Sequence, residues 1–234
     1  MGHPTGVEIG IEINAVRIPK EIDGNLFLSL LPLVSEEKRR RIERFVYRED
    51  ALRALLGEML VRRIIQTKLG LSNDEIRFKR NRYGKPFLEN CEDCYFNISH
   101  SGEWVVGVIH SKPIGIDVEQ IQTIDLEIAQ RFFAEEEYRA MQNRPDIERQ
   151  SFFYDMWTLK ESYMKAIGKG LSVPLDSFSI QIVSKDEIRL TEGEKAANYH
   201  FKQYDIDPGY KLSVCAESDR FPSRVTMLDW REVC

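Results

Sequence analysis

The sequence lacks several features that define large classes of protein. Its 234 residues include 33 Lys and Arg against 38 Asp and Glu, a net charge of −5, so it has no basic excess of the kind that supplies most nucleic-acid affinity. The longest apolar run, residues 26–34, has nine residues, whereas a bilayer-spanning helix needs about 20. The N-terminus shows no secretory signal, and Gly6 stands where a myristoylation signal has Ser or Thr. We therefore expect a cytoplasmic protein with no nucleic-acid partner and no membrane segment.

Cysteine is scarce, and the common nucleotide-binding glycine loops are missing. Four cysteines are too few for a disulfide scaffold in a chain of this length. Cys91 and Cys94 form a C-x2-C pair, but Cys215 and Cys234 do not supply the second pair that a structural zinc site needs. No Walker loop, no G-x-G-x-x-G and no G-x-S-x-G elbow occurs. The missing glycine motifs exclude the commonest nucleotide-binding loops and the hydrolase elbow. The low number of cysteines favours reduced thiols.

The hydrophobic pattern that is present predicts alternating helices and strands. Apolar alternation over 7–13 predicts a strand, and helical spacing from Arg48 to Leu69 predicts a helix that ends at Gly70. Hydrophobic residues make up 42 % of the chain, enough for a sizeable core in one large or two small domains. The same reasoning predicts further strands at 76–79, 95–99, 104–110, 114–119, 178–183, 200–205, 210–217 and 225–229, and further helices at 126–141 and 147–167.

A weak internal repeat relates the two parts of the chain. The residues Leu, Glu and Arg at 56, 58 and 62 match Leu, Glu and Lys at 159, 161 and 165, an offset of 103. The strands 104–110 and 210–216 match at an offset of 106. The matching order of elements predicts an α/β (α+β) fold of two similar halves, 1–113 and 114–234. A site shared by two such halves would lie in the cleft between them.

Asp117 and Glu119 form the first candidate site. They are two residues apart in the predicted strand 114–119, so they point to one face while Ile116 and Val118 point to the core. Two carboxylates on one face repel each other unless a cation lies between them, and hard oxygen ligands suit Mg²⁺. An ordinary strand with a solvated acidic face has the same pattern, so both interpretations stay open.

Glu161 and Lys165 form the second candidate. They are four residues apart on the predicted helix 147–167 and therefore share a helix face. A surface ion pair has the same spacing and, taken alone, is the better explanation of it. The neighbouring Trp157 and Met164 belong to an apolar stripe that is typical of a core.

Two further segments could bind a phosphate. The predicted strand 95–99 ends in Ser99-His100-Ser101-Gly102, which places an imidazole and hydroxyl groups at a sheet end. The stretch 38–48 holds six positive charges, and Lys85 adds another on a tight turn. Because four glutamates at 36, 37, 43 and 49 dilute the basic stretch, a solvated helix face is the alternative.

In this order the segments resemble the motif set of the 4′-phosphopantetheinyl transferases, and most closely the surfactin-synthetase-activating (Sfp-type) branch. The three main motifs are 96–101, 115–119 and 157–166. Supporting similarity covers 83–86, 131–133, 168–171, 174–178 and 207–211. The resemblance implies two pseudo-twofold-related α/β halves with the active site in the cleft between them. It also implies transfer of phosphopantetheine from coenzyme A to a serine of an apo carrier protein, with release of adenosine 3′,5′-bisphosphate.

The resemblance implies roles for particular side chains. Asp117, Glu119 and Glu161 would bind Mg²⁺ at the pyrophosphate, and Lys165 would contact the same phosphates. Glu161 would also orient or deprotonate the serine hydroxyl, so Glu161 and Lys165 are the predicted catalytic residues. The remaining predicted coenzyme A contacts are Lys38, Lys85, Ser99 and His100 at the 3′-phosphate, with Tyr83 and Pro86 at the adenine. Two positions depart from the branch, since Arg41 replaces a common Lys at a phosphate contact and Ala54 replaces a Thr that often contacts the ligand.

The resemblance also implies a partner surface. Segment 120–134 would dock apo peptidyl or acyl carrier proteins, although at least one of Phe132 and Phe133 is expected to lie in the core. Because duplicated halves build the cleft internally, we expect a monomer. Two alternatives stay open, a non-catalytic coenzyme A-binding or regulatory module and another Mg²⁺-dependent phosphodiesterase.

Overall fold

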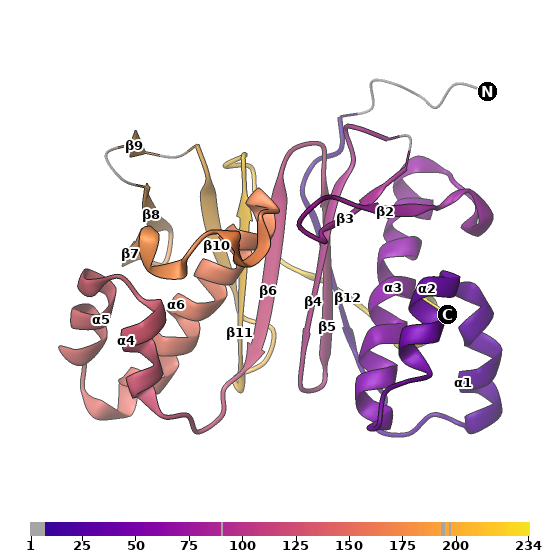
Figure 1. Cartoon of the computed structure of the whole chain (residues 1–234), viewed down its shortest axis with the longest axis horizontal. Coiled ribbons are helices and arrows are strands. Elements are labelled where there is room, and N and C mark those ends of the chain that lie inside the picture. Colours follow the sequence, from indigo (N-terminus) through magenta and orange to yellow (C-terminus); the bar gives the residue numbers. More distant parts are fainter. Residues whose placement is uncertain (1–7, 90, 193–194, 197) are drawn as a thin grey trace.

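The computed structural model describes residues 8–89, 91–192, 195–196 and 198–234, and Figure 1 shows its two α/β halves side by side. Residue 7 of the predicted first strand lies outside the described residues. The helices are α1 (Gly24–Leu30), α2 (Glu36–Ile42), α3 (Arg48–Leu69), α4 (Ala129–Phe132), α5 (Glu135–Gln142) and α6 (Asp146–Ile167). The strands are β1 (Glu12–Arg17), β2 (Phe78–Arg80), β3 (Pro86–Leu88), β4 (Tyr95–Ser101), β5 (Trp104–His110), β6 (Ile114–Gln120), β7 (Ser179–Ser184), β8 (Glu187–Glu192), β9 (Lys195–Ala196), β10 (His200–Tyr204), β11 (Tyr210–Ala216) and β12 (Thr226–Leu228).

The two central sheets share one topology. In the first half β5 pairs antiparallel with both β1 and β4, and in the second half β11 pairs antiparallel with both β6 and β10. Each half therefore orders its strands first, third, second along the chain, with the long helix α3 or α6 in the first connection. The fold class predicted from the repeat is confirmed.

The repeat of the long helices has a different register from the predicted offset of 103. Both α3 and α6 have 22 residues and end at a glycine in the left-handed conformation, Gly70 and Gly168, which are 98 residues apart. The packing of the helices on their sheets agrees with this register. Leu60 of α3 lies against Gly107 of β5. In the second half the equivalent pair is Thr158 of α6 and Ser213 of β11, whose hydroxyl groups are hydrogen-bonded at 2.7 Å. The match of positions 56, 58 and 62 to 159, 161 and 165 is therefore wrong by five residues, because identity at three helical positions says nothing about the packed face.

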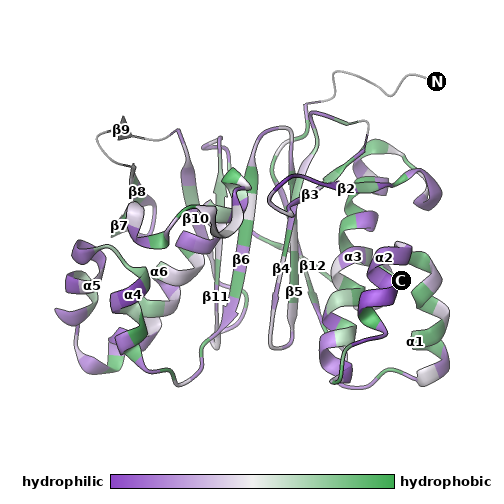
Figure 2. Cartoon of the chain, in the orientation of Figure 1, coloured by the Kyte–Doolittle hydropathy of each residue, from purple (hydrophilic) through white to green (hydrophobic). Residues whose placement is uncertain are grey.

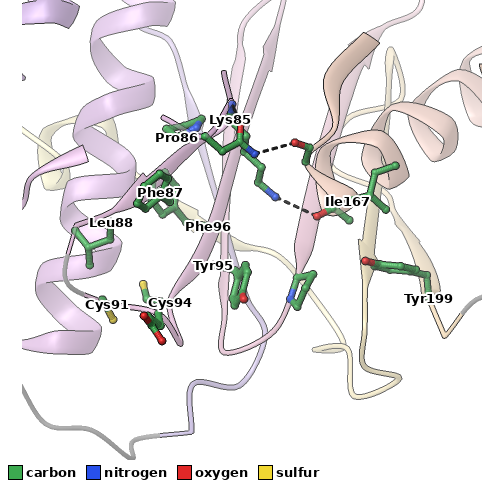
Figure 3. A pocket seen from close by; sticks show the side chains of 15 residues that line it. Lys85, Pro86, Phe87, Leu88, Cys91, Cys94, Tyr95, Phe96, Ile167 and Tyr199 are labelled. Atoms are coloured by element: carbon green, nitrogen blue, oxygen red, sulfur yellow. Dashed lines mark hydrogen bonds between the residues drawn. The ribbon is translucent and has the colours of Figure 1, made fainter. Parts of the chain in front are cut away.

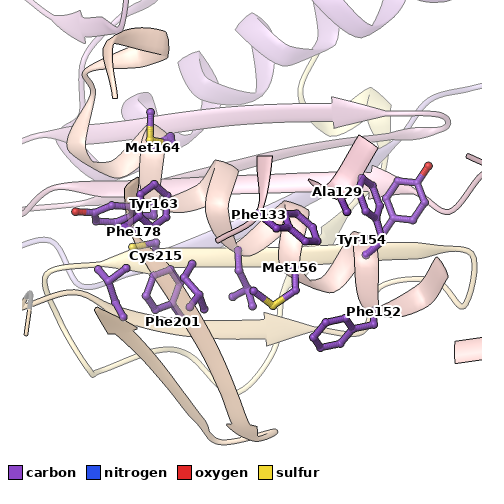
Figure 4. Packing of buried hydrophobic residues seen from close by; sticks show 14 of the residues in the cluster. Ala129, Phe133, Phe152, Tyr154, Met156, Tyr163, Met164, Phe178, Phe201 and Cys215 are labelled. Carbon is purple, nitrogen blue, oxygen red and sulfur yellow. The ribbon is translucent and has the colours of Figure 1, made fainter. Parts of the chain in front are cut away.

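The halves pack as four layers, helix on sheet on sheet on helix (Figure 1). One hydrophobic cluster lies between α3 and its sheet, another between α6 and its sheet, and a third between the two sheets. Figure 4 shows the α6 cluster, which includes Phe133, Tyr163 and Phe178. Hydrophobic residues follow the central strands and polar residues cover the outer helices such as α5 (Figure 2). The central strands carry apolar residues on both faces because each sheet is buried between a helix on one side and the other sheet on the other side.

Three further features differ from the predicted elements. The predicted helix 126–141 is divided into a 3₁₀ turn, α4 and α5, because the chain is extended at Phe133 and Ala134. The first strand begins at Glu12, although Ile9 is also buried and its amide nitrogen donates to Ser111 Oγ at 2.6 Å. The C-terminal β12 returns to the first half and pairs parallel with β1.

In the part of the chain that the structure describes, none of the helices combines the length and the apolar character that a membrane span requires.

Candidate active site

Asp117 lies at the junction of the halves, on β6 where it faces β4 and α6. Its side chain is 2 % exposed. Oδ1 accepts hydrogen bonds from Ser99 Oγ at 2.8 Å and from Lys165 Nζ at 2.6 Å, whereas the buried Oδ2 has no partner. Lys165 Nζ also contacts Ser99 Oγ at 3.0 Å. Three predicted site residues from three separate motifs are thus in direct contact.

Glu119 and Glu161 lie beside this group. Ser101 Oγ donates to Glu119 Oε2 at 2.8 Å, so the second hydroxyl of the Ser-His-Ser motif serves the second carboxylate. Burial and then the nearby Asp117 charge raise the pKa of Glu119 to about 7. Burial and the same Asp117 charge also raise the pKa of Glu161. The pKa of Asp117 is raised by burial, against the lowering effect of Lys165 and Ser99. Burial therefore opposes ionisation of all three carboxylates, and the Asp117 charge adds to this effect at Glu119 and Glu161.

The close approach of β6 and α6 depends on Gly115. A Cβ at this position would lie 2.1 Å from the Ser162 carbonyl oxygen and 2.4 Å from the Ala166 nitrogen. Only glycine lets the helix backbone come this near the strand. Asn97 joins the sheets at the same level, because its Oδ1 accepts from the Ile116 nitrogen at 3.0 Å. Neither residue was among the predicted site residues, although a glycine and a buried amide inside strand patterns are the signals that could have indicated them.

A cavity of about 480 Å³ opens beside the carboxylates. Its wall is formed by Lys38, Gly57, Ile98, Ser99, His100, Asp117, Glu119, Trp157, Glu161 and Lys165. Burial lowers the pKa of Lys38, with Glu58 opposing and Arg41 adding to this effect. His100 is exposed, but partial desolvation by the surrounding atoms lowers its pKa, and Lys38 and Lys165 add to the lowering. The cavity therefore joins an acidic wall to a cationic one.

A second cavity, of about 330 Å³, adjoins the first through Glu161 and Lys165. Tyr83 and Pro86, the two predicted adenine contacts, are among the residues that line it. Lys85 also lines this cavity, but its Nζ donates to the carbonyl oxygens of Ile114 at 3.2 Å, Lys165 at 2.5 Å and Ala166 at 3.2 Å. Burial lowers the pKa of Lys85 to about 8. In this arrangement Lys85 stabilises the last turn of α6, and contact with a phosphate would require it to leave these carbonyls.

A third hollow, of about 620 Å³, is also lined by Lys85 (Figure 3). Phe87, Cys91, Cys94 and Tyr199 are among the residues around it, and none of the predicted carboxylates lines it. All four cysteines are free in the structure.

The remaining predicted residues fall in different surroundings. Arg41 is exposed on α2 and does not line the cavity, although it is close enough to Lys38 to affect its charge. Phe133 is 3 % exposed and stacks on Phe153, so the expectation that one phenylalanine of segment 120–134 is core is confirmed. Trp157, predicted as core, has an edge contact with Phe132 and also lines the cavity.

The predicted metal ligands Asp117, Glu119 and Glu161 do not form a ready cage. Among the residues that the structure describes, no three acidic, His or Cys side chains are gathered closely enough to hold a metal ion together. The ammonium of Lys165 pairs with one oxygen of Asp117, at 2.6 Å. The unpartnered, buried Asp117 Oδ2 and an all-oxygen donor set nevertheless fit a hard cation such as Mg²⁺.

Carboxylates and lysines that converge in a cleft between duplicated halves are the arrangement of an enzyme that acts on a phosphorylated ligand. Comparison with known proteins makes this specific. Residues 22–112 match the family model "4'-phosphopantetheinyl transferase, N-terminal", and residues 113–215 match that of the "4'-phosphopantetheinyl transferase superfamily". The chain is 42 % identical to the 4'-phosphopantetheinyl transferase Sfp of Bacillus subtilis, over 87 % of this chain and 91 % of that protein. It is 40 % identical to the 4'-phosphopantetheinyl transferase gsp of Aneurinibacillus migulanus, over 96 % and 94 %.

The chain belongs to the 4′-phosphopantetheinyl transferase family, and its similarity to the Sfp-type members is confirmed. The two family models meet between residues 112 and 113.

Proposed function

We propose that this enzyme transfers the 4′-phosphopantetheine group of coenzyme A to a serine of an apo carrier protein. The observation that carries the proposal is the contact of Asp117 with Ser99 and Lys165, which joins three family motifs at one cavity. The family to which the chain belongs is named for this activity. The adjoining cavities provide room for a nucleotide and its phosphates on opposite sides of Glu161 and Lys165.

Asp117, Glu119 and Glu161 would hold Mg²⁺ against the pyrophosphate of coenzyme A. When bound, the ion would neutralise charge on the pyrophosphate and stabilise the leaving group. The buried Asp117 Oδ2 supports this assignment, because an unpartnered carboxylate oxygen in a dry position needs a cation or a hydrogen-bond donor. The raised pKa values of Glu119 and Glu161 support it as well, since a nearby cation would favour their ionised forms.

The transfer is an in-line displacement at the phosphorus that carries the pantetheine arm. A bond forms between the carrier serine oxygen and this phosphorus, and the bond to the bridging oxygen breaks, which releases adenosine 3′,5′-bisphosphate. Glu161 would take the serine proton, directly or through water, as a carboxylate with a raised pKa can do near neutral pH. Lys165 would orient the same phosphates. Lys38 and His100 would hold the 3′-phosphate on the cationic wall.

Segment 120–134 would dock the carrier protein. Phe132 is half-buried and contacts Trp157, whose ring also lines the cavity. A carrier that binds on Phe132 would therefore present its serine close to Glu161. An apolar contact surface would also suit acidic carriers, which the net charge of −5 would otherwise repel.

Intact mass spectrometry tests the proposal. The protein is incubated with coenzyme A, Mg²⁺ and several apo carriers, and each carrier is expected to gain the mass of one phosphopantetheine. Asp117→Asn keeps the side-chain shape and should abolish the gain, whereas Asp219→Asn, an exposed change outside the site and the docking segment, should leave the gain unchanged. Binding of coenzyme A without transfer to any carrier would instead identify a binding module. Hydrolysis of coenzyme A without a carrier would identify a phosphodiesterase.

A further inference from the structure

Glu58 is a buried carboxylate on α3 that the proposed mechanism does not use. It is 7 % exposed and follows Gly57, which lines the cavity. Its Oε1 accepts hydrogen bonds from the Ser35 backbone nitrogen at 2.6 Å and from Arg62 Nε at 3.0 Å. Its Oε2 accepts from Ser35 Oγ at 3.1 Å. The carboxylate thus binds one residue of another segment through two separate groups.

Ser35 determines where α2 begins. It is the N-cap residue of this seven-residue helix, and its Oγ accepts from the backbone nitrogen of Lys38 at 3.3 Å. A helix this short does not form without outside support. Glu58 supplies that support at the residue that starts the helix, and Lys38 follows three residues later with its side chain in the cavity wall.

Arg62 holds Glu58 in place. Its guanidinium pairs with the Glu58 carboxylate one helical turn earlier, and both side chains are almost completely buried. Arg62 NH1 donates to the Asn73 backbone and side-chain oxygens, each at 3.1 Å, and Asn73 Nδ2 donates to the Leu33 carbonyl at 3.1 Å. One network, buried at the Glu58–Arg62 pair, therefore bonds to the chain on both sides of residue 34, just before α2.

We propose that Glu58 is a positioning residue for the 3′-phosphate of coenzyme A, which acts by holding Ser35 and thereby α2 so that Lys38 faces the cavity. The inference rests on the proposed function, in which Lys38 binds that phosphate. The negative charge of Glu58 also favours the protonated form of Lys38, whose burial opposes protonation. The network is thus placed both to aim the lysine and to keep it charged.

Glu58→Gln is the discriminating variant. Glutamine has the same shape but no charge, so it loses the ion pair with Arg62, and its amide nitrogen cannot accept the hydrogen bond that Glu58 Oε2 accepts from Ser35 Oγ. The variant, Lys38→Met, the double variant and the exposed control Glu49→Gln on the same helix are compared. KM and kcat are measured with coenzyme A and with 3′-dephospho-coenzyme A. Binding of adenosine 3′,5′-bisphosphate and of adenosine 5′-monophosphate is measured by calorimetry.

We expect Glu58→Gln to raise KM for coenzyme A about tenfold with kcat almost unchanged, the loss typical of one charge-assisted hydrogen bond. KM for the 3′-dephospho substrate and affinity for the monophosphate should stay unchanged, and the double variant should be no worse than Lys38→Met alone. Equal losses for both substrates, or additive effects of the two changes, would overturn the inference.

The outcomes separate this inference from the proposed function. If Lys38→Met leaves the affinity for adenosine 3′,5′-bisphosphate unchanged while carriers still gain mass, the positioning role fails and the transferase activity stands. If Glu58→Gln does not fold, Ser35→Ala replaces it, because this change removes only the Oγ contact. Ser35→Ala should raise KM for coenzyme A about threefold with the same selectivity, and an unselective effect would refute the role.

Discussion

The acidic cluster should destabilise the ligand-free protein at neutral pH, and Glu119→Gln tests this expectation. The pKa of Glu119 is raised from 4.5 to about 7, mainly by burial and then by Asp117. The folded state therefore keeps a proton that the unfolded chain releases. The stability that this proton contributes is present in full below pH 4.5 and is lost as the pH rises through about 7. A shift of this size corresponds to about 3 kcal/mol, which partial exposure of the side chain reduces to about 1–2 kcal/mol.

Thermal unfolding at pH 5 and pH 8, in buffer with a chelator, measures the effect. Glutamine does not ionise, so at pH 8 the variant should unfold about 2–8 °C above the unchanged protein, and the difference should shrink towards pH 5. Glu49→Gln, an exposed change, should show no such pH dependence. The variant should also lose transfer activity, because a carboxylate ligand is gone. A variant that is equally stable at both pH values, or less stable at pH 8, would refute this account of the cluster.

Three further predictions concern packing, docking and the metal. Gly115→Ala would bring a Cβ to 2.1 Å from the Ser162 carbonyl oxygen, and we expect a loss of about 3 kcal/mol in urea unfolding; unchanged stability would contradict the close-approach argument. Phe133→Ala should cost about 3–5 kcal/mol of stability, whereas Phe132→Ala should raise KM for the carrier and leave KM for coenzyme A unchanged; similar stability losses in both would contradict their different surroundings. Removal of divalent cations should stop transfer and added Mg²⁺ should restore it, and transfer that survives exhaustive chelation would remove the metal from the mechanism.

Periodicity predicted the local geometry of the site correctly where one element decided it. Asp117 and Glu119 share a face of β6 because strand side chains alternate, and this required no knowledge of the partner elements. The prediction of helix 126–141 was wrong in its middle, where Phe133 is core while the chain around it is extended. Phe133 ends α4 in an extended conformation while its ring is buried in the core, and helical spacing alone does not show this break.

The helix register is the clearest case in which sequence similarity misled. Matching letters aligned Glu58 with Glu161, yet the packed helices align 98 residues apart and the two glutamates do different things. Glu58 is buried against Ser35 and Arg62, whereas Glu161 lines the cavity. The two glutamates have different roles because their helices pack against different surroundings.

By itself the sequence determined the alternation of elements, the duplicated halves and the motifs that identify the family, because periodicity and motif order are local properties of the chain. Only the tertiary structure decided which charges meet. It placed Lys165 on Asp117 and Ser101 on Glu119, while Lys85 lies against backbone carbonyls and Arg41 lies in solvent. Contacts between distant segments depend on how layers pack and on where a glycine permits close approach, and composition and spacing do not contain that information.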